Sequence, residues 1–277
     1  MSFDPRFFYD DYPRIEGAFG ALVDTSLSPR GPGMLFQIVR ELDLPPDSIA
    51  LDVGCGEGKH AVRLAIHFGF EVLGVDPAQR HLDLAREARR DEVEEISSRL
   101  SFSRGIANHL PVDDASVDLV WCRDVLVHVG SLDEAYAEFA RVLRPGGRGI
   151  IYQLVRTPML SEAEAVALFP VMGVVPSSME AEAHDAAIAR AGLQIDEDFD
   201  LGSEWGEHAE EESGGRSSAL LRLARLRRDP DRYRAAFGDA AYDVMLGDAL
   251  WQVYPMLGKL SSRILVLTRP HSSTASR

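Results

Sequence analysis

Residues 51–60 read Leu51-Asp52-Val53-Gly54-Cys55-Gly56-Glu57-Gly58-Lys59-His60. They join the end of an apolar run to the start of a helical pattern. Glycines at three alternate positions leave no side chains in this turn, so a ligand can lie against bare backbone N–H groups. Asp52, just before the turn, can accept hydrogen bonds from a cationic or hydroxylated ligand. The stretch predicts a ligand-binding turn between a strand and a helix; the alternative is a tight turn that binds nothing.

The next strand pattern supplies a second polar group. Residues 71–76 read as a strand that ends in Asp76, and an acid at this position can hold the two hydroxyls of a ribose. The glycine spacing is G-x-G-x-G, whereas a nicotinamide dinucleotide site normally has its third glycine one residue later. The combination favours a nucleoside ligand and argues against a dehydrogenase.

Length and charge restrict the class of partner. A chain of 277 residues can bury one large core, or one core and a small subdomain. Its hydrophobic content of 45% is ordinary for a globular protein. The formal net charge of −15 argues against a nucleic-acid partner, because phosphate groups would be repelled. A small-molecule partner is therefore expected.

The two cysteines, Cys55 and Cys122, fall at predicted strand ends and indicate a reducing cytosol rather than a disulfide framework. Neither has a partner at metal-ligand spacing, so no metal site is predicted. The N-terminus lacks the basic and apolar regions of a signal peptide. No apolar run reaches the roughly 20 residues of a membrane span. These observations predict a cytoplasmic protein.

Strand and helix patterns alternate between residues 34 and 155, which predicts an α/β fold with a doubly wound parallel sheet. Residues 144–147 are expected to form a turn. The expected strands are 48–53, 72–76, 100–104, 117–122, 148–155, 193–201 and 264–268. The expected helices are 34–42, 59–68, 77–90, 131–143, 161–168 and 179–191.

The chain divides into unequal parts. Residues 1–33 are rich in aromatic and turn-forming residues and are expected to form an N-terminal arm. The main domain is expected at 34–270, with a helical insertion at about 205–260 between its last two strands. Residues 271–277 are expected to be a disordered tail.

Four motifs in order give the chain a family resemblance. It resembles the class I S-adenosylmethionine-dependent methyltransferases, in the small-molecule branch similar to ubiquinone/menaquinone and sterol C-methyltransferases. The motifs cover about residues 48–155 and imply a Rossmann-like, seven-stranded mixed sheet of order 3-2-1-4-5-7-6, with strand 264–268 antiparallel. The matching segments are 51–58 (the first family motif), 74–76 (the ribose acid), 110–112 with 116–120 (strand four) and 141–147 (leading into strand five).

The resemblance implies a cofactor, S-adenosylmethionine, and a site for it. Gly54 and Gly56 would lie against its methionine and ribose portions, Asp52 near its ammonium, and Asp76 on its ribose. Pro77 and Arg80 would border the adenine, Ala107 and Asn108 would contact it, and Cys122 and Arg123 would line the methionine side. The full set implied is Asp52, Gly54, Cys55, Gly56, Asp76, Pro77, Arg80, Ala107, Asn108, Cys122 and Arg123.

One departure from the family concerns adenine. Relatives often have an acid where this chain has Ile106. Ile106 cannot accept a hydrogen bond from the adenine amine, so Asn108 or a backbone carbonyl must do so.

Candidates for acid–base chemistry are fewer. His128 is a candidate base or hydrogen-bond donor on the substrate side; a packing role is the alternative. Tyr9 in the arm, with Tyr12, is a candidate to close over the cofactor and shape the acceptor pocket, or else packs as an ordinary aromatic. The acidic run 207–212, with His208, either supplies a base or magnesium ligands or is a solvated face.

The sequence therefore predicts an enzyme that transfers a methyl group from S-adenosylmethionine to a small, apolar metabolite. Whether carbon, oxygen or nitrogen is methylated stays open. The alternatives are a non-methylating reaction in the same fold and a cofactor-binding module without turnover. Apolar residues of the insertion are expected to build the acceptor pocket, with core packing as the alternative for Trp205 and Trp251. The others are Leu220, Leu221, Leu223, Phe237, Tyr242, Met245 and Leu250.

Overall fold

The structure is a computed structural model of the chain and describes residue 9 and residues 11–271. Apart from His271, the predicted tail lies outside the described residues, as do residues 1–8 and 10 of the predicted arm. Within the described part, no helix is long and apolar enough to cross a membrane.

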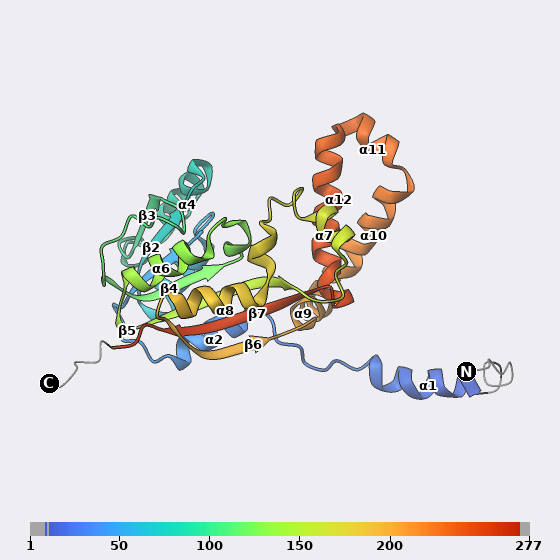
Figure 1. The fold of residues 1–277 in the computed structure, drawn as a ribbon, viewed down its shortest axis with the longest axis horizontal. Coiled ribbons are helices and arrows are strands. Elements are labelled where there is room, and N and C mark those ends of the chain that lie inside the picture. The colour runs from blue at the N-terminus through green and yellow to red at the C-terminus, as the bar shows by residue number, and fades with distance from the viewer. Residues whose placement is uncertain (1–8, 10, 272–277) are drawn as a thin grey trace.

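A seven-stranded sheet forms the centre of the described residues (Figure 1). Its order is β3-β2-β1-β4-β5-β7-β6, which confirms the order that the resemblance implies. β7 pairs antiparallel with β5 and with β6, and the other neighbours are parallel. The strands are β1 Ile49–Val53, β2 Glu71–Asp76, β3 Leu100–Arg104, β4 Val117–Arg123, β5 Leu143–Arg156, β6 Gln194–Asp200 and β7 Leu260–Thr268.

Helices cover both faces of this sheet. On one face α6 and α8 bury Tyr136, Phe139 and Ile188 in one hydrophobic cluster, and on the other α2 and α3 bury Phe36 and Leu64 in a second. The helices are α1 Tyr12–Val23, α2 Gly33–Glu41, α3 Lys59–Phe68, α4 Gln79–Asp91, α5 Glu94–Ser97, α6 Leu132–Val142, α7 Glu162–Leu168, α8 Ala181–Arg190, α9 Glu204–Ser213, α10 Gly215–Arg228, α11 Pro230–Phe237 and α12 Asp239–Val253. Short 3-10 turns are η2 Leu126–His128, η3 Pro176–Met179 and η4 Tyr254–Leu257.

Two strands are longer than the sequence predicts. The turn expected at 144–147 lies inside β5, where the Gly146 N–H donates to the Arg269 carbonyl at 2.7 Å. β7 begins at Leu260 instead of residue 264, because polar residues hide its first half from a hydrophobicity pattern. Buried Arg263 in that half is neutralised by ion pairs with Asp185 (2.8 Å) and Asp198 (2.7 Å).

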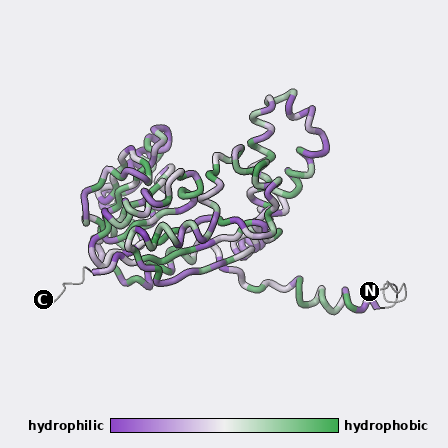
Figure 2. Tube along the Cα trace, viewed as in Figure 1, coloured by the Kyte–Doolittle hydropathy of each residue, from purple (hydrophilic) through white to green (hydrophobic). Residues whose placement is uncertain are grey.

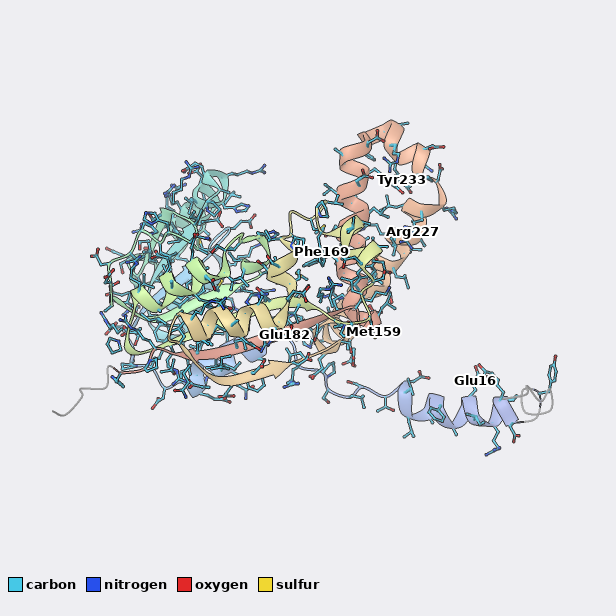
Figure 3. All side chains as sticks on the ribbon, viewed as in Figure 1. Glu16, Met159, Phe169, Glu182, Arg227 and Tyr233 are labelled. Carbon is cyan, nitrogen blue, oxygen red and sulfur yellow. The ribbon has the colours of Figure 1, made fainter. Side chains whose placement is uncertain are left out.

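The helices α9–α12 form a unit between β6 and β7 that projects from one end of the sheet (Figure 1). Arg227 and Tyr233 mark its part farthest from the sheet (Figure 3). The two ends of this unit come together, because the Leu201 N–H donates to the Ser262 carbonyl at 2.8 Å. The unit therefore enters and leaves the fold at one point of the sheet.

Helix α1 extends away from the sheet (Figure 1) and buries none of its residues. Hydrophobic residues nevertheless run along it (Figure 2), and Phe19, Leu22 and Val23 are exposed.

The functional region follows from the strand order. The order reverses between β1 and β4, and parallel strands leave a crevice at their carboxyl ends where such a reversal occurs. Val53, Asp76 and Arg123 are the last residues of β1, β2 and β4, so their loops meet at this crevice.

Candidate functional site

A cavity of about 640 Å³ lies at the carboxyl ends of β1, β2 and β4, and we call it the glycine-loop cavity. It is lined by Val53, Gly54, Gly56, Val75, Asp76, Pro77, Ala78, His81, Gly105, Ile106, Ala107, Asn108, Arg123, Asp124, Val125, His128, Val129, Gly130 and Glu134.

The loop after β1 needs its glycines for two different reasons. Gly54 and Gly56 both have positive φ angles, 72° and 53°, which side chains rarely adopt. A Cβ on Gly54 would lie 2.1 Å from Val125 Cγ2, so packing forbids a side chain there. A Cβ on Gly56 would meet nothing within 4 Å, because that face opens into the cavity.

The backbone N–H groups of Gly54, Cys55 and Gly56 are already used, which corrects one expectation for this part of the loop. Gly54 and Cys55 donate to the Val75 carbonyl at 2.7 and 3.1 Å, and Gly56 donates to Asp76 Oδ2 at 3.0 Å. At these three residues the expectation that a ligand lies against bare N–H groups is wrong, because acceptors on β2 already hold the groups. The glycines supply space for a ligand instead of hydrogen-bond donors.

Asp76 is the acid that faces the loop. Besides Gly56, its carboxylate accepts from the Ala78 N–H at 2.8 Å and contacts His81 Nδ1 at 3.1 Å. A carboxylate offers about four acceptor positions, so one remains for a ligand hydroxyl. The sequence pointed to Arg80 next to this site, but Arg80 is exposed and its neighbour His81 lines the cavity.

Asp52 lies beneath the same loop and is 2% exposed. Its carboxylate accepts from the Ala61 backbone N–H, while Oδ2 has no hydrogen-bond partner among the described residues. Burial, and to a lesser extent the charge of Asp76, raises the pKa of Asp52 to about 7. Asp52 is not among the residues that line the glycine-loop cavity, although its neighbour Val53 is. A buried acceptor without a partner suits a ligand that brings a cationic group.

The adenine candidates Ala107 and Asn108 line the cavity, as does Pro77. Asn108 Nδ2 donates to the Ser131 carbonyl (3.3 Å) and to Glu134 Oε2 (2.8 Å). This arrangement leaves Asn108 Oδ1 as the free acceptor that the departure at Ile106 requires.

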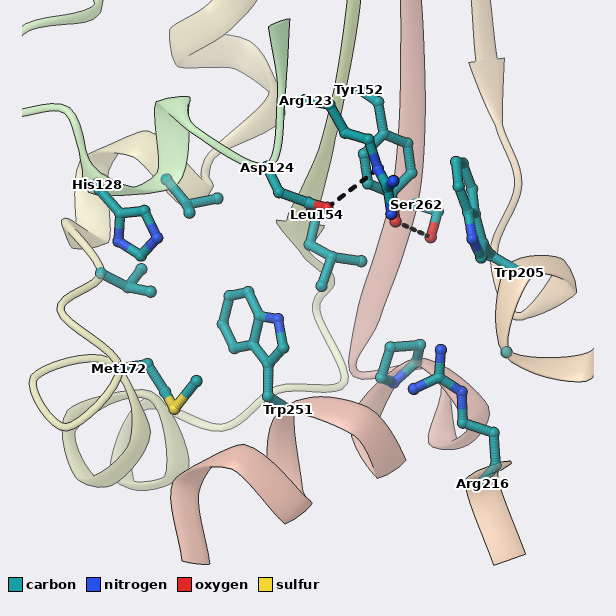
Figure 4. A pocket seen from close by; sticks show the side chains of 14 residues that line it. Arg123, Asp124, His128, Tyr152, Leu154, Met172, Trp205, Arg216, Trp251 and Ser262 are labelled. Carbon is teal, nitrogen blue, oxygen red and sulfur yellow. Dashed lines mark hydrogen bonds and ion pairs between the residues drawn. The ribbon is translucent and has the colours of Figure 1, made fainter. Parts of the chain in front are cut away.

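A second cavity of about 320 Å³ adjoins the first, and we call it the arginine cavity (Figure 4). The sheet supplies one wall, and the helical unit α9–α12 with η4 supplies another. It is lined by Arg123, Asp124, Val127, His128, Tyr152, Leu154, Met172, Val174, Trp205, Gly206, Arg216, Trp251, Pro255 and Ser262.

Arg123, Asp124 and His128 line both cavities, so the two meet at these residues. Arg123 is held by His60 Nε2 (2.9 Å from its Nη1) and by Asp124 Oδ2 (3.4 Å from its Nε). Burial, with the charges of Arg123 and Arg63, lowers the pKa of His60 to about 4, so this ring is neutral and accepts the bond.

Asp124 has a left-handed backbone conformation, with φ of 58°. Its side chain is 47% exposed, and it borders the two cavities. The surrounding protein withdraws solvent and raises the pKa of Asp124 to about 6, although Arg123 and His128 act in the opposite direction. The junction thus holds a carboxyl group whose pKa is raised above its ordinary value.

His128 is oriented by a backbone carbonyl. Its Nδ1 lies 2.9 Å from the Gly173 oxygen, which can only accept, so Nδ1 carries the proton. Nε2 of the neutral ring is then left with a lone pair. This tautomer can accept a proton from a group bound in the arginine cavity, which His128 faces (Figure 4).

Other predicted residues lie elsewhere. Cys55 and Cys122 are buried, and burial raises the pKa of both thiols, so they pack as small apolar groups. Tyr9 is 79% exposed in the arm, and its role stays a prediction. Among the described residues, no group of three or more acidic, histidine or cysteine side chains could hold a metal ion.

The insertion contributes to the arginine cavity differently from the prediction. Of its nine apolar candidates, only Trp205 and Trp251 line the cavity. Trp205 packs on Tyr152 with ring centroids 4.0 Å apart. The polar lining residues Asp124, Tyr152, Arg216 and Ser262 were not predicted, because only the tertiary arrangement of β5, α10 and β7 brings them together.

Comparison with known proteins finds methyltransferases that are similar to this chain. A family described as a methyltransferase domain matches residues 51–151. Methyltransferase GfsG of Streptomyces halstedii is 33% identical over 61% of this chain and 61% of its own. The 27-O-demethylrifamycin SV methyltransferase of Amycolatopsis mediterranei is 31% identical over 62% and 65%. A sterol 24-C-methyltransferase of Pneumocystis carinii is 27% identical over 52% and 39%. The chain thus spans less than two thirds of the length of these relatives.

A solved structure shares the fold. Phosphoethanolamine N-methyltransferase 2 of Haemonchus contortus, in complex with phosphomonomethylethanolamine and S-adenosylhomocysteine, has a TM-score of 0.64 and 22% identity. The alignment covers 89% of this chain and 55% of that one.

Proposed function

We propose that the chain is a class I S-adenosylmethionine-dependent methyltransferase and that it methylates a small acceptor bound in the arginine cavity. The match of residues 51–151 to a methyltransferase domain family supports this proposal. S-adenosylmethionine, the cofactor of this family, is assigned to the glycine-loop cavity. One observation carries the proposal: the two cavities meet at Arg123, Asp124 and His128. Methyl transfer needs two molecules held end to end, and adjoining cavities provide for that.

The residues of the glycine-loop cavity fit this cofactor. The open face of Gly56 leaves room for a nucleoside, and Asp76 has an acceptor position left for a ribose hydroxyl. The unpartnered oxygen of Asp52 suits the cofactor ammonium, and Asn108 Oδ1 suits the adenine amine. When bound, the cofactor supplies an electrophilic methyl group on a positively charged sulfur.

The residues at the junction supply the acid–base chemistry. As the acceptor atom bonds to the methyl carbon, the bond from that carbon to sulfur would break and its electron pair would return to sulfur, leaving a neutral thioether. The acceptor loses its proton to His128 Nε2, so the imidazole becomes an imidazolium. The Gly173 carbonyl keeps the ring oriented throughout, and the nearby Asp124 carboxylate stabilises the new positive charge. Trp205 and Trp251 cover the acceptor and limit the access of water.

The alternative, a chain that binds the cofactor without transferring its methyl group, makes a different prediction. It expects binding of S-adenosylhomocysteine but no conversion of S-adenosylmethionine with any acceptor. The described residues hold a histidine with a free ring nitrogen at the junction of the cavities, which supports transfer.

His128→Asn tests the proposal. We expect turnover to fall by about a hundredfold or more, since general-base catalysis contributes this much, while the affinity for S-adenosylhomocysteine stays unchanged. Turnover would be followed as conversion of S-adenosylmethionine with a panel of small hydroxyl and amine acceptors, and affinity by calorimetry. His67→Asn, on the exposed side of α3, is the matched control. Wild-type protein without affinity for S-adenosylhomocysteine would overturn the proposal.

A further inference from the structure

Arg216, the second residue of α10, brings a cationic side chain from the helical insertion into the arginine cavity (Figure 4). Its Nη1 donates to the Gln252 carbonyl at 3.2 Å. Its Nε is buried and has no hydrogen-bond partner among the described residues. A buried guanidinium donor without a partner is costly, so a native protein normally provides one.

The carboxylates near Arg216 are engaged elsewhere. Glu210 accepts from the backbone N–H groups of Arg216 (2.9 Å) and Ser217 (2.8 Å). Asp124 pairs with Arg123 at 3.4 Å. Within the described ranges, no ion pair to the Arg216 guanidinium is formed.

The cavity therefore has a surplus of positive charge. Two guanidinium groups line it against one carboxyl group, in a chain whose formal net charge is −15. The surplus is local, because acidic residues dominate the rest of the molecule. A cationic cavity in an acidic protein attracts anions selectively, since the remaining surface repels them.

The polar groups are arranged along the cavity. Figure 4 shows Arg216 and Ser262 at one end and His128 at the other, with Trp251 between them. Ser262 Oγ lies 3.2 Å from the Tyr152 hydroxyl, so hydroxyl groups share the end with Arg216. A molecule anchored at Arg216 would extend past the indole of Trp251 and present its other end to His128.

We propose that the acceptor carries an oxyanion, a carboxylate or a phosphate ester, which Arg216 binds so that the far end of the acceptor meets His128. This inference rests on the proposed function, because it names the acceptor class of the same site. Guanidinium forms paired, charge-assisted hydrogen bonds with both kinds of oxyanion, which is the chemistry that an unpaired buried Nε requires.

The test uses the whole 277-residue chain saturated with S-adenosylhomocysteine and three probes of similar size: benzoate, phenyl phosphate and neutral benzyl alcohol. Calorimetry measures the affinity of each. We expect one or both anions to bind at least about tenfold more tightly than benzyl alcohol, which is the effect of a charge-assisted bond. Binding of benzoate alone assigns a carboxylate, and binding of phenyl phosphate alone assigns a phosphate ester.

Variants of α10 locate the anion. Arg216→Gln should weaken the binding of the anionic probe at least about tenfold. Arg216→Lys should weaken this binding less, because the charge remains. Arg228→Gln, which removes the same charge from the exposed end of the same helix, should change nothing. Thermal unfolding and the affinity for S-adenosylhomocysteine establish that each variant is folded.

Three results would overturn the inference: no binding of either anion, equal binding of benzyl alcohol, or full retention of anion affinity in Arg216→Gln. Should Arg216→Gln fail to fold, Arg216→Lys and the salt dependence of wild-type binding decide, since added salt must weaken only the anions. Loss of the inference leaves S-adenosylhomocysteine binding and the His128 result intact. Failure of the proposed function instead appears as a wild-type protein that does not bind S-adenosylhomocysteine.

Discussion

The two adjoining cavities are built in different ways. The glycine-loop cavity is lined by residues between Val53 and Glu134, most of them in loops that directly follow parallel strands. The arginine cavity draws on residues from Arg123 to Ser262, including three helices of the insertion. The first depends on short, local patterns of sequence, whereas the second exists only when distant segments pack together.

This difference separates two tasks. A cofactor shared by many enzymes can be bound by backbone shape and one or two acids, and these are the features of the glycine loop. An acceptor particular to one enzyme needs side chains chosen individually, such as Arg216 and Trp251. Changes in the glycine loop should therefore affect cofactor binding, and changes in the insertion should affect the acceptor alone.

The largest effect is expected for Gly54→Ala. The new methyl group would lie 2.1 Å from Val125 Cγ2 at a φ of 72°, so the loop must shift. We expect a loss of about 2–4 kcal/mol of folding stability from strain and overpacking. The affinity for S-adenosylhomocysteine should fall by about a hundredfold or more, near 2.7 kcal/mol. Thermal unfolding and calorimetry measure the two.

Gly192→Ala is the matched control, because Gly192 has the same φ of 72° but no atom within 4 Å of the added Cβ. It should lose about 1 kcal/mol of stability from backbone strain alone and retain full affinity. Equal behaviour of the two variants would show that the packing of Gly54 against Val125 is not what shapes the cavity.

Asp76→Ala should have the next largest effect. It removes the carboxylate that holds Gly56 and faces the cavity, so affinity for S-adenosylhomocysteine should fall by about 1.5–3 kcal/mol, ten- to a hundredfold. Asp83→Ala removes an exposed acid of α4 and should leave affinity unchanged. An unaltered calorimetric affinity in Asp76→Ala would contradict the ribose assignment.

The smallest effect is a pH dependence from Asp52. Its pKa of about 7 in the free protein means that the carboxyl group is protonated at low pH and must ionise to receive a cation. Binding of S-adenosylhomocysteine should therefore be about tenfold weaker at pH 6 than at pH 8, near 1.4 kcal/mol, and level off above pH 8. Calorimetry in buffers of different ionisation enthalpy would detect the released proton.

Asp52→Asn separates this effect from the titration of Asp124, because only the Asp52 contribution disappears.

The raised pKa of Asp52 also affects the pH dependence of folding stability. Since the pKa is raised above its ordinary value of 3.8, Asp52 favours the folded state less as the pH rises from about 4 to 7. The variant should lose less stability than wild-type protein over this range; parallel losses would mean that Asp52 titrates normally.

Sequence alone predicts the part of the molecule around the glycine-loop cavity, where local patterns of residues determine the structure. The glycine corner and Asp76 follow from residue spacing, because a turn and a strand end each have their own sequence signature, whereas the strand order follows from the family resemblance. The use of the loop N–H groups by Val75 and Asp76 does not, since it depends on how closely β1 and β2 pack. For the same reason Arg80 was singled out instead of His81: a shift of one residue on α4 decides which side chain faces inward.

The arginine cavity has no local sequence pattern from which it could be predicted. Arg216 is one of many arginines in α10, and nothing in its neighbourhood distinguishes it from Arg222 or Arg228. The position of Arg216 beside Trp205 and Ser262 on the cavity wall follows only from the tertiary arrangement. The first half of β7 was hidden likewise, because buried Arg263 looks like a loop residue until its two acidic partners are placed.

The backbone hydrogen bond between Leu201 and Ser262 joins the two ends of the helical unit, so the unit is attached to the sheet at a single place. Such a unit can be exchanged for another, by evolution or by design, without disturbing the register of β1, β2 and β4. A chimera that receives the segment equivalent to residues 202–259 from a relative should retain its affinity for the cofactor and change its acceptor specificity. The sheet with its glycine-loop cavity can therefore stay constant while the helical unit α9–α12 is exchanged.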